Sequence, residues 1–177
     1  DRRVANNDYR WGGLQAKEIH SATIGIIGFG RIGGALANLL AALGAAVLGY
    51  DVNPRDDLAG IVTYTTKADL LQRADVVSLH VDLNETSVGL IGAAEFASMQ
   101  PTAGLVNASR GPVIDTTALI TALETGELAG VALDTVSGGA TIFTVAHQEA
   151  GLTSHPDTEK LPPPSNVILT AHLAFFT

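Results

Sequence analysis

The sequence contains no cysteine, and lysine and arginine are scarce in it. Without cysteine, disulfides, thiol nucleophiles and cysteine-bound metals are excluded. The 10 basic residues stand against 18 acidic ones, which gives a formal net charge of −8, and the basic residues form no cluster. Nucleic acids and anionic membrane surfaces are therefore poor candidate partners.

Long apolar runs are missing too. No run approaches the ~20 residues of a membrane span, and the start, Asp1-Arg2-Arg3, does not resemble a signal peptide. We therefore expect a soluble protein of the cytoplasm that binds no membrane. The chain also lacks G-x-S-x-G and H-E-x-x-H motifs, and the spacing of its histidines suits no metal. We interpret three of them as surface residues and expect no metal site: His20, His147 and His155.

A glycine motif between two short apolar runs is the most informative feature that is present. The run 23–27 stops at Gly28-x-Gly30-x-x-Gly33, where an Ala/Leu-rich helical pattern begins at once. In a dinucleotide-binding turn Gly28 allows the tight bend, Gly30 lets the backbone approach the pyrophosphate, and Gly33 permits close helix–strand packing. The N-terminus of the following helix faces the phosphate charge. The motif predicts a dinucleotide site; the alternative is a glycine-rich turn without a ligand.

The second apolar run ends on Asp51, at the distance from the glycine motif that a dinucleotide fingerprint requires. A carboxylate there accepts hydrogen bonds from the adenosine ribose hydroxyls and repels a 2′-phosphate. The residue therefore favours NAD over NADP. Taken alone, an aspartate such as Asp51 is more often just a solvated carboxylate at a strand end.

Strand-like and helix-like segments alternate along the chain. The apolar share of 46% and the positive mean hydropathy suit a sheet that is covered on both faces. We predict an α/β fold with a doubly wound parallel sheet of Rossmann type, six strands and helices on both faces. The predicted strands are 23–27, 45–50, 75–80, 104–107, 130–133 and 166–170, and helices are expected after the glycine motif and at 67–73, 95–99 and 116–124.

Two regions depart from this alternation. Residues 1–22 are polar and are predicted to form an N-terminal arm or interdomain segment, which leaves residues 23–177 as the NAD-binding domain. Residues 135–165 form a long irregular stretch, and loops of that length are usually functional or disordered.

Polar residues follow the ends of several predicted strands, where ligands of open α/β sheets bind. Arg110 has the fork geometry that holds a carboxylate in a bidentate pair, although an arginine also commonly neutralises a nearby acid. His172 is able to move a proton at neutral pH, although a lone histidine is more often structural. Asp134 can accept a hydrogen bond from the nicotinamide carboxamide or simply cap its loop.

Together these segments resemble the NAD-binding domain of the D-isomer-specific 2-hydroxyacid dehydrogenases, from about Trp11 to Thr177. Ile142-Phe143 and the ending 174–177 are similar to the D-lactate dehydrogenase branch. The resemblance is carried by Gly28-Phe29-Gly30-Arg31-Ile32-Gly33, Tyr50-Asp51, His80-Val81-Asp82-Leu83-Asn84, Asn107-Ala108-Ser109-Arg110-Gly111-Pro112, Gly130-Val131-Ala132-Leu133-Asp134 and Asn166-Val167-Ile168-Leu169-Thr170-Ala171-His172.

The resemblance implies a reduction of a 2-oxo acid to a D-2-hydroxy acid by hydride transfer from NADH. Arg110 would bind the substrate carboxylate, and His172 would give a proton to the carbonyl oxygen. It also implies a homodimer when full length, with a substrate domain built from segments that this chain lacks, so we expect a fragment of a longer enzyme. The residues expected to bind the cofactor are Gly28, Gly30, Arg31, Ile32, Gly33, Asp51, His80, Val81, Asp82, Ala108, Ser109 and Asp134.

Three positions depart from the family pattern. Gly139 stands where the family has a glutamate paired with the histidine, and Asp82 and Ala171 stand where it usually has proline. The missing glutamate suits an alternative function, that of a non-catalytic NAD-binding or NAD-sensing protein. Retention of Arg110 and His172 argues against that alternative, and also against a methyltransferase, because neither needs both residues at one edge.

Overall fold

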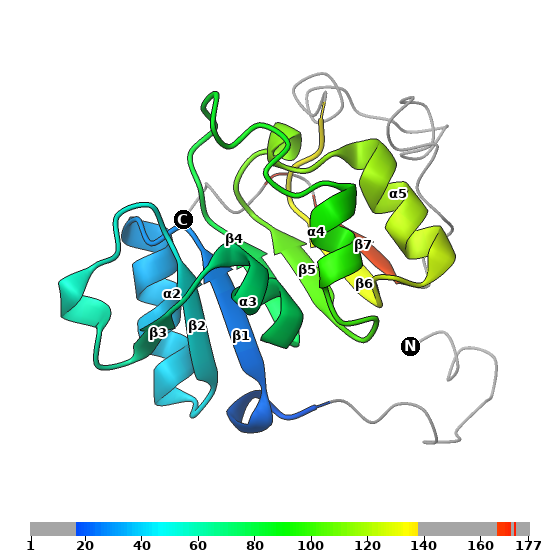
Figure 1. The fold of residues 1–177 in the computed structure, drawn as a ribbon. Coiled ribbons are helices and arrows are strands. Elements are labelled where there is room, and N and C mark those ends of the chain that lie inside the picture. The colour runs from blue at the N-terminus through cyan, green and yellow to red at the C-terminus, as the bar shows by residue number, and fades with distance from the viewer. Residues whose placement is uncertain (1–16, 138–165, 171, 173–177) are drawn as a thin grey trace.

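In the part of the chain that the computed structural model describes, residues 17–137, 166–170 and 172, seven parallel strands form one sheet (Figure 1). Its order is β3-β2-β1-β4-β5-β6-β7. The strands are β1 (Thr23–Ile27), β2 (Ala46–Tyr50), β3 (Val62–Tyr64), β4 (Val76–Leu79), β5 (Gly104–Asn107), β6 (Gly130–Leu133) and β7 (Val167–Leu169). The helices are α2 (Arg31–Ala42), α3 (Lys67–Arg73), α4 (Ala93–Ser98) and α5 (Thr116–Thr125), with 3-10 turns η1 (Ile19–Ser21), η2 (Asp56–Leu58) and η3 (Gly111–Val113).

The prediction of an α/β doubly wound parallel sheet is confirmed, but the predicted count of six strands is wrong. The strand that the sequence did not reveal is β3, which has only three residues and pairs with β2 at the edge of the sheet. Thr63 at its centre is exposed, so the segment shows no continuous apolar run. A strand this short is held in place by its hydrogen bonds to β2, and its own three residues show too little pattern to predict it.

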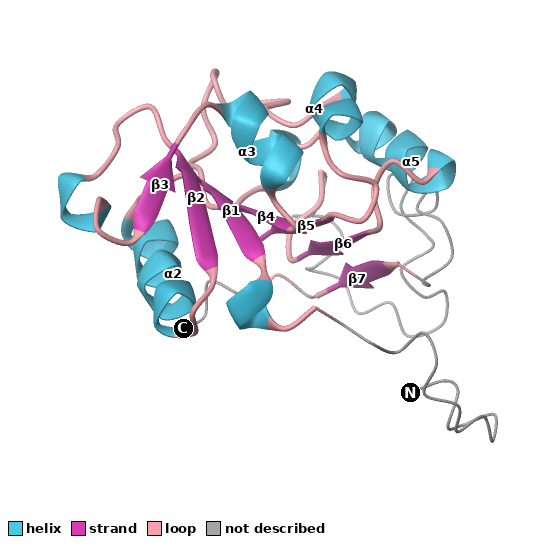
Figure 2. Cartoon of the chain, turned by 60° about the horizontal axis from the view of Figure 1, so that its bottom comes forward, coloured by secondary structure: helices cyan, strands magenta, loops and turns pink. Residues whose placement is uncertain are grey.

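Helices cover both faces of the sheet, as predicted. Figure 2 shows α3, α4 and α5 on one side and α2 on the other. Successive residues of β1 serve the two sides in turn: Ile24 and Ile26 belong to the core under α2, and Ile27 belongs to the larger core under α3, α4 and α5. A Cβ on Gly25 would lie 2.5 Å from a methyl carbon of Leu70, so α3 packs directly on the backbone of β1.

The strand order places the functional edge of the sheet. From β1 the chain builds outward through β2 to β3, then returns to the other side of β1 to form β4. Ligands of open α/β sheets bind at such a switch point, beyond the carboxyl ends of the strands. The residues after β1, β2 and β4 are therefore brought together. Among the described residues no helix has the length and apolar character that crossing a membrane requires.

Candidate coenzyme and substrate site

The turn after β1 is closed tightly against the neighbouring strands. The Gly28 N–H donates to the Tyr50 carbonyl, at 3.0 Å. Gly28 has φ +97°, and a Cβ there would lie 2.6 Å from the backbone oxygen of His80. Only glycine combines that left-handed backbone with so close an approach. The turn is thus fixed between the ends of β2 and β4.

The two other glycines of the motif have different surroundings. A Cβ on Gly33 would lie 2.0 Å from the Gly28 carbonyl oxygen, an impossible overlap, so this glycine is needed for packing. Among the described residues, no atom lies within 4 Å of the position that a Cβ on Gly30 would take, and this residue is exposed. Gly30 is also the N-cap of α2. The first backbone N–H groups of a helix have no partner within the helix and are able to bind an anion. The turn therefore leaves room for a pyrophosphate where the sequence predicts one.

A cavity of about 730 Å³ opens beside this turn. Its size is in the range of cofactor sites. Tyr50, Val52, Asn53 and the 84–87 loop add further parts of its wall. Of the residues predicted to bind the cofactor, its lining includes Gly28, Gly30, Arg31, Ile32, Asp51, His80, Val81 and Asp82. Gly33 lies buried beneath the turn, and the described lining of this cavity does not include Ala108, Ser109 or Asp134.

The carboxylate of Asp51 is held in place by backbone groups. One of its oxygens accepts a hydrogen bond from the Phe29 N–H at 2.5 Å, and the other accepts from the Asn53 N–H at 2.8 Å. A carboxylate oxygen has two lone pairs, so each oxygen retains one for a ligand hydroxyl. Asp51 is thus fixed to the glycine turn and still able to accept hydrogen bonds from a ribose.

His80 forms part of the cavity wall at the end of β4. Its Nε2 lies 2.9 Å from the Ser78 hydroxyl oxygen, and the residue is partly buried. Burial lowers the pKa of His80 below its ordinary value, because a charged imidazolium is poorly solvated there. The native state therefore holds this histidine neutral where an unfolded chain would already take up a proton.

We predict that this difference weakens the fold in mild acid. The unfolded state, with a histidine pKa of about 6.5, binds more protons than the native state below that pH, so the free energy of unfolding falls as pH drops through it. His80→Gln keeps an amide for Ser78 and removes the titration. In denaturant melts between about pH 7.5 and pH 5.5, the variant should lose less stability than the parent. His20→Gln, at an exposed site in η1, is the matched control; equal pH slopes for all three proteins would contradict the prediction.

The turn that carries Arg110 is shaped by a buried asparagine at the end of β5. The Asn107 side-chain oxygen accepts from the Ser109 N–H at 3.0 Å and from the Ser109 hydroxyl at 2.7 Å, and its amide donates to the Arg110 carbonyl at 3.0 Å. A Cβ on Gly111 would lie 2.1 Å from the carbonyl carbon of Val136, so the turn packs against the segment that follows β6. The position of Arg110 is therefore set by β5 and β6 together.

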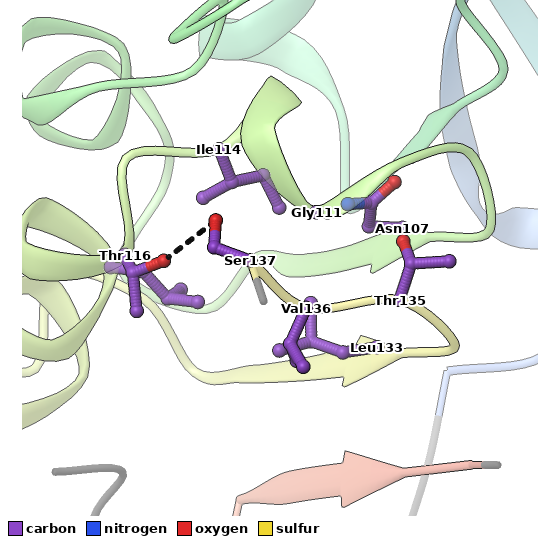
Figure 3. A pocket seen from close by; sticks show the side chains of 9 residues that line it. Asn107, Gly111, Ile114, Thr116, Leu133, Thr135, Val136 and Ser137 are labelled. Atoms are coloured by element: carbon purple, nitrogen blue, oxygen red, sulfur yellow. Dashed lines mark hydrogen bonds between the residues drawn. The ribbon is translucent and has the colours of Figure 1, made fainter. Parts of the chain in front are cut away.

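Figure 3 shows the other side of this contact, a small cavity between the Asn107 turn and the segment Thr135–Ser137. Thr116 at the start of α5 and Ser137 hydrogen-bond across it, with 3.5 Å between their hydroxyl oxygens. The Thr135 hydroxyl is buried, and no hydrogen-bond partner for it lies among the described residues. The turn that carries Arg110, the segment after β6 and the start of α5 are therefore packed against one another.

Arg110 itself projects from the turn and is exposed. Its guanidinium donates to the Ser109 carbonyl at 2.8 Å. Within the part of the chain that the structure describes, no carboxylate lies at ion-pair distance from it. The structural alternative, an arginine that neutralises a neighbouring acid, thus finds no such acid among these residues.

Asp134 and His172 follow the adjacent strands β6 and β7. The Asp134 N–H donates to the Asn107 carbonyl at 3.0 Å, and its carboxylate accepts from the Thr170 hydroxyl at 2.5 Å. His172 lies two residues beyond Thr170 and has φ +55°, an uncommon backbone conformation for a residue other than glycine. The ends of β5, β6 and β7 therefore bring Arg110, Asp134 and the segment of His172 to the same edge of the sheet.

Some predicted features lie outside the described residues: Gly139, Ala171, Ile142-Phe143, His147, His155 and the first 16 residues. The sequence interpretation in turn missed Asn107 as the residue that shapes the Arg110 turn. The signal was available, because an asparagine two residues before a serine is typical of an Asx turn. It also missed Arg55, for which the sequence pattern offers no signal.

Comparison with known proteins bears on the identity of this site. Residues 1–174 match the family described as "D-isomer specific 2-hydroxyacid dehydrogenase, NAD binding domain". The chain belongs to this family. Among curated relatives, a "D-2-hydroxyacid dehydrogenase (NAD(+))" of Clostridioides difficile is 39% identical over 99% of this chain, and a "D-lactate/D-glycerate dehydrogenase" of Pediococcus acidilactici is 36% identical over 99% of it.

Solved structures of the same family have the same fold. A D-lactate dehydrogenase from Sporolactobacillus sp. is 47% identical, with a TM-score of 0.93 over 100% of this chain. The NAD-complexed form of a D-isomer specific 2-hydroxyacid dehydrogenase from Lactobacillus delbrueckii ssp. bulgaricus is 37% identical, with a TM-score of 0.91 over 99% of it. The chain spans 53% of both curated relatives and 53% and 54% of these two structures, about half of each.

Proposed function

We propose that the protein carrying this NAD-binding domain is an NAD-dependent D-2-hydroxyacid dehydrogenase of the D-lactate dehydrogenase type. It would reduce a 2-oxo acid to the D-2-hydroxy acid. The observation that carries the proposal is the meeting, at one edge of the sheet, of a coenzyme cavity beside β1, β2 and β4 with Arg110 and the segment of His172 beside β5 and β7. The names of the relatives support the same reaction.

In this proposal the coenzyme, when bound, supplies the hydride that reaches carbon 2 of the oxo acid. Arg110 binds the substrate carboxylate through its two-pronged guanidinium, which fixes the orientation of the carbonyl. His172 delivers the proton that the carbonyl oxygen needs as it becomes a hydroxyl. Gly30 and the N-terminus of α2 receive the pyrophosphate, Asp51 the adenosine ribose, and Asp134 the nicotinamide carboxamide.

Assays with the full-length protein test this function. NADH should be oxidised when pyruvate or a larger 2-oxo acid is added, and the product should be the D-isomer by chiral chromatography. NADH binding without turnover on any 2-oxo acid would instead support a non-catalytic NAD-binding protein, an alternative that the named relatives do not favour. A homodimer and a cytoplasmic location also stay proposals; sedimentation equilibrium and cell fractionation of the full-length protein would test them.

We predict that the protein binds NADH more tightly than NADPH, because the fixed carboxylate of Asp51 would face the added 2′-phosphate. Calorimetric titration with both coenzymes measures the preference. Asp51→Ala should weaken NADH binding, through loss of the ribose hydrogen bonds, and narrow the gap between the two coenzymes. Equal affinities of the parent protein for NADH and NADPH would show that Asp51 is not part of the coenzyme site.

A further inference from the structure

Arg55, in the loop after β2, is bound by a neighbouring carboxylate. Its Nε lies 3.0 Å from one oxygen of Asp57, and its Nη2 lies 2.6 Å from the other. This is a bidentate pair, the arrangement in which a guanidinium has the best geometry for an oxyanion. Two of the five N–H donors of the guanidinium, on its Nε–Nη2 edge, are thereby already bound to a carboxylate.

The guanidinium lies next to the coenzyme turn. Its Nη1 donates to the Gly30 carbonyl at 3.4 Å, and the same nitrogen is 2.6 Å from the position that a Cβ on Gly34 would take. Asp51 contacts the preceding residue of the turn, through the Phe29 N–H. The Arg55 cation and the carboxylate proposed to face the adenosine ribose are thus bound to consecutive residues of one turn.

An arginine in this place is the usual device by which a Rossmann fold accepts the 2′-phosphate of NADP. Here the loop contains such an arginine and also an acid that binds it. We infer that Asp57 is a second determinant of coenzyme choice: it holds the Arg55 guanidinium away from a 2′-phosphate and so adds to the discrimination against NADP(H) made by Asp51.

The charges of the pair agree with this role. The hydrogen-bonded Arg55 guanidinium lowers the pKa of the Asp57 carboxyl, which therefore stays ionised at neutral pH, and Asp57 in turn raises the pKa of Arg55. A 2′-phosphate brings about −1.5 to −2 charges, so it must both displace Asp57 and approach its negative charge. The Arg55 side chain is 39% exposed and that of Asp57 63%, and an exposed pair is weak. The expected effect on NADPH binding is therefore moderate, about three- to tenfold.

The decisive experiment is Asp57→Asn in the full-length protein, with dissociation constants for NADH and NADPH measured by calorimetry. The NADPH constant should fall about three- to tenfold, while the NADH constant should change less than about twofold. Asp56→Asn is the matched control, because it removes the same charge from the adjacent residue of η2, which forms no described ion pair with Arg55. The double variant Arg55→Gln/Asp57→Asn should lose the gain, and Asp57→Ser should reproduce it.

Four results would overturn the inference. Weaker binding of both coenzymes by Asp57→Asn would show that the Arg55–Asp57 pair supports the structure of the glycine turn instead. An equal gain from Asp56→Asn would reduce the effect to net charge, and a gain that survives in the double variant would exclude Arg55. The inference rests on the proposed coenzyme site, and the two can fail separately: absence of NADH binding by the parent protein refutes the site, whereas normal NADH binding with an unchanged NADPH constant refutes only the role of Asp57.

Discussion

Gly33→Ala should destabilise the domain by about 1–3 kcal/mol or more, whereas Gly30→Ala, at the N-cap of α2, should cost less than about 1 kcal/mol. The new methyl group at Gly33 would lie 2.0 Å from the carbonyl oxygen of Gly28, and its next neighbour is the Gly28 carbonyl carbon at 3.1 Å. Both are backbone atoms, so no side chain can rotate away, and α2 must shift from the sheet. A loss of this size is a large part of the total stability of an ordinary domain, about 5–15 kcal/mol.

Gly30→Ala is the matched substitution, because its methyl group would meet no atom of the described part of the chain within 4 Å. The same methyl group projects from the turn that lines the coenzyme cavity, where the pyrophosphate is proposed to approach the backbone. Denaturant melts should therefore separate the two variants in stability, and calorimetry should show that Gly30→Ala weakens NADH binding about tenfold or more, the effect of losing one or two charge-assisted hydrogen bonds. Equal stability of the two variants would contradict the geometry of the turn. Unchanged NADH binding by Gly30→Ala would show that the pyrophosphate does not bind at this turn.

This contrast also marks what the sequence alone could predict. The spacing of Gly28, Gly30 and Gly33 between a strand and a helix predicts the turn, and parallel strands bring the residues after β1, β2 and β4 to one edge. The different roles of Gly30 and Gly33 agree with the motif. How much a substitution at each costs depends on distances to atoms of other residues, which a sequence pattern does not contain. Local order in the sequence was thus enough to predict the architecture and to bring several of the proposed coenzyme residues to one cavity.

What the sequence did not predict depends on partners that are distant or hidden in a loop. The strand β3 exists because β2 offers it hydrogen bonds, and its three residues alone carry too little pattern to reveal it. From the sequence, Arg55 is an ordinary charged residue of a polar loop, and only its contacts with Asp57 and Gly30 distinguish it. The cofactor role of every predicted residue stays a prediction, and Ala108, Ser109 and Asp134 are in addition not part of the described cavity lining.

Arg110→Lys in the full-length enzyme should lower kcat/KM for a 2-oxo acid far more than it changes either the fold or NADH binding. Lysine keeps the positive charge but loses the two-pronged geometry, and truncation of a buried, hydrogen-bonded charge pair costs about 2–5 kcal/mol. At about 1.36 kcal/mol for each factor of ten, the expected loss is about 30-fold to several-thousand-fold. The turn should survive, because Asn107 and Gly111 shape it through backbone contacts, and the only described bond of the Arg110 side chain is to the Ser109 carbonyl.

Steady-state kinetics with pyruvate, together with calorimetry for NADH and a thermal melt, measure the three quantities separately. Arg73→Lys is the matched control, since it makes the same exchange at an exposed arginine of α3 that pairs with Asp69 four residues before it. That variant should keep the parent kcat/KM. If Arg110→Lys also keeps it, the guanidinium does not bind the substrate carboxylate. If kcat/KM and the melting temperature fall together, the residue supports the turn rather than the substrate, and the cation that orients the oxo acid must come from another part of the full-length protein.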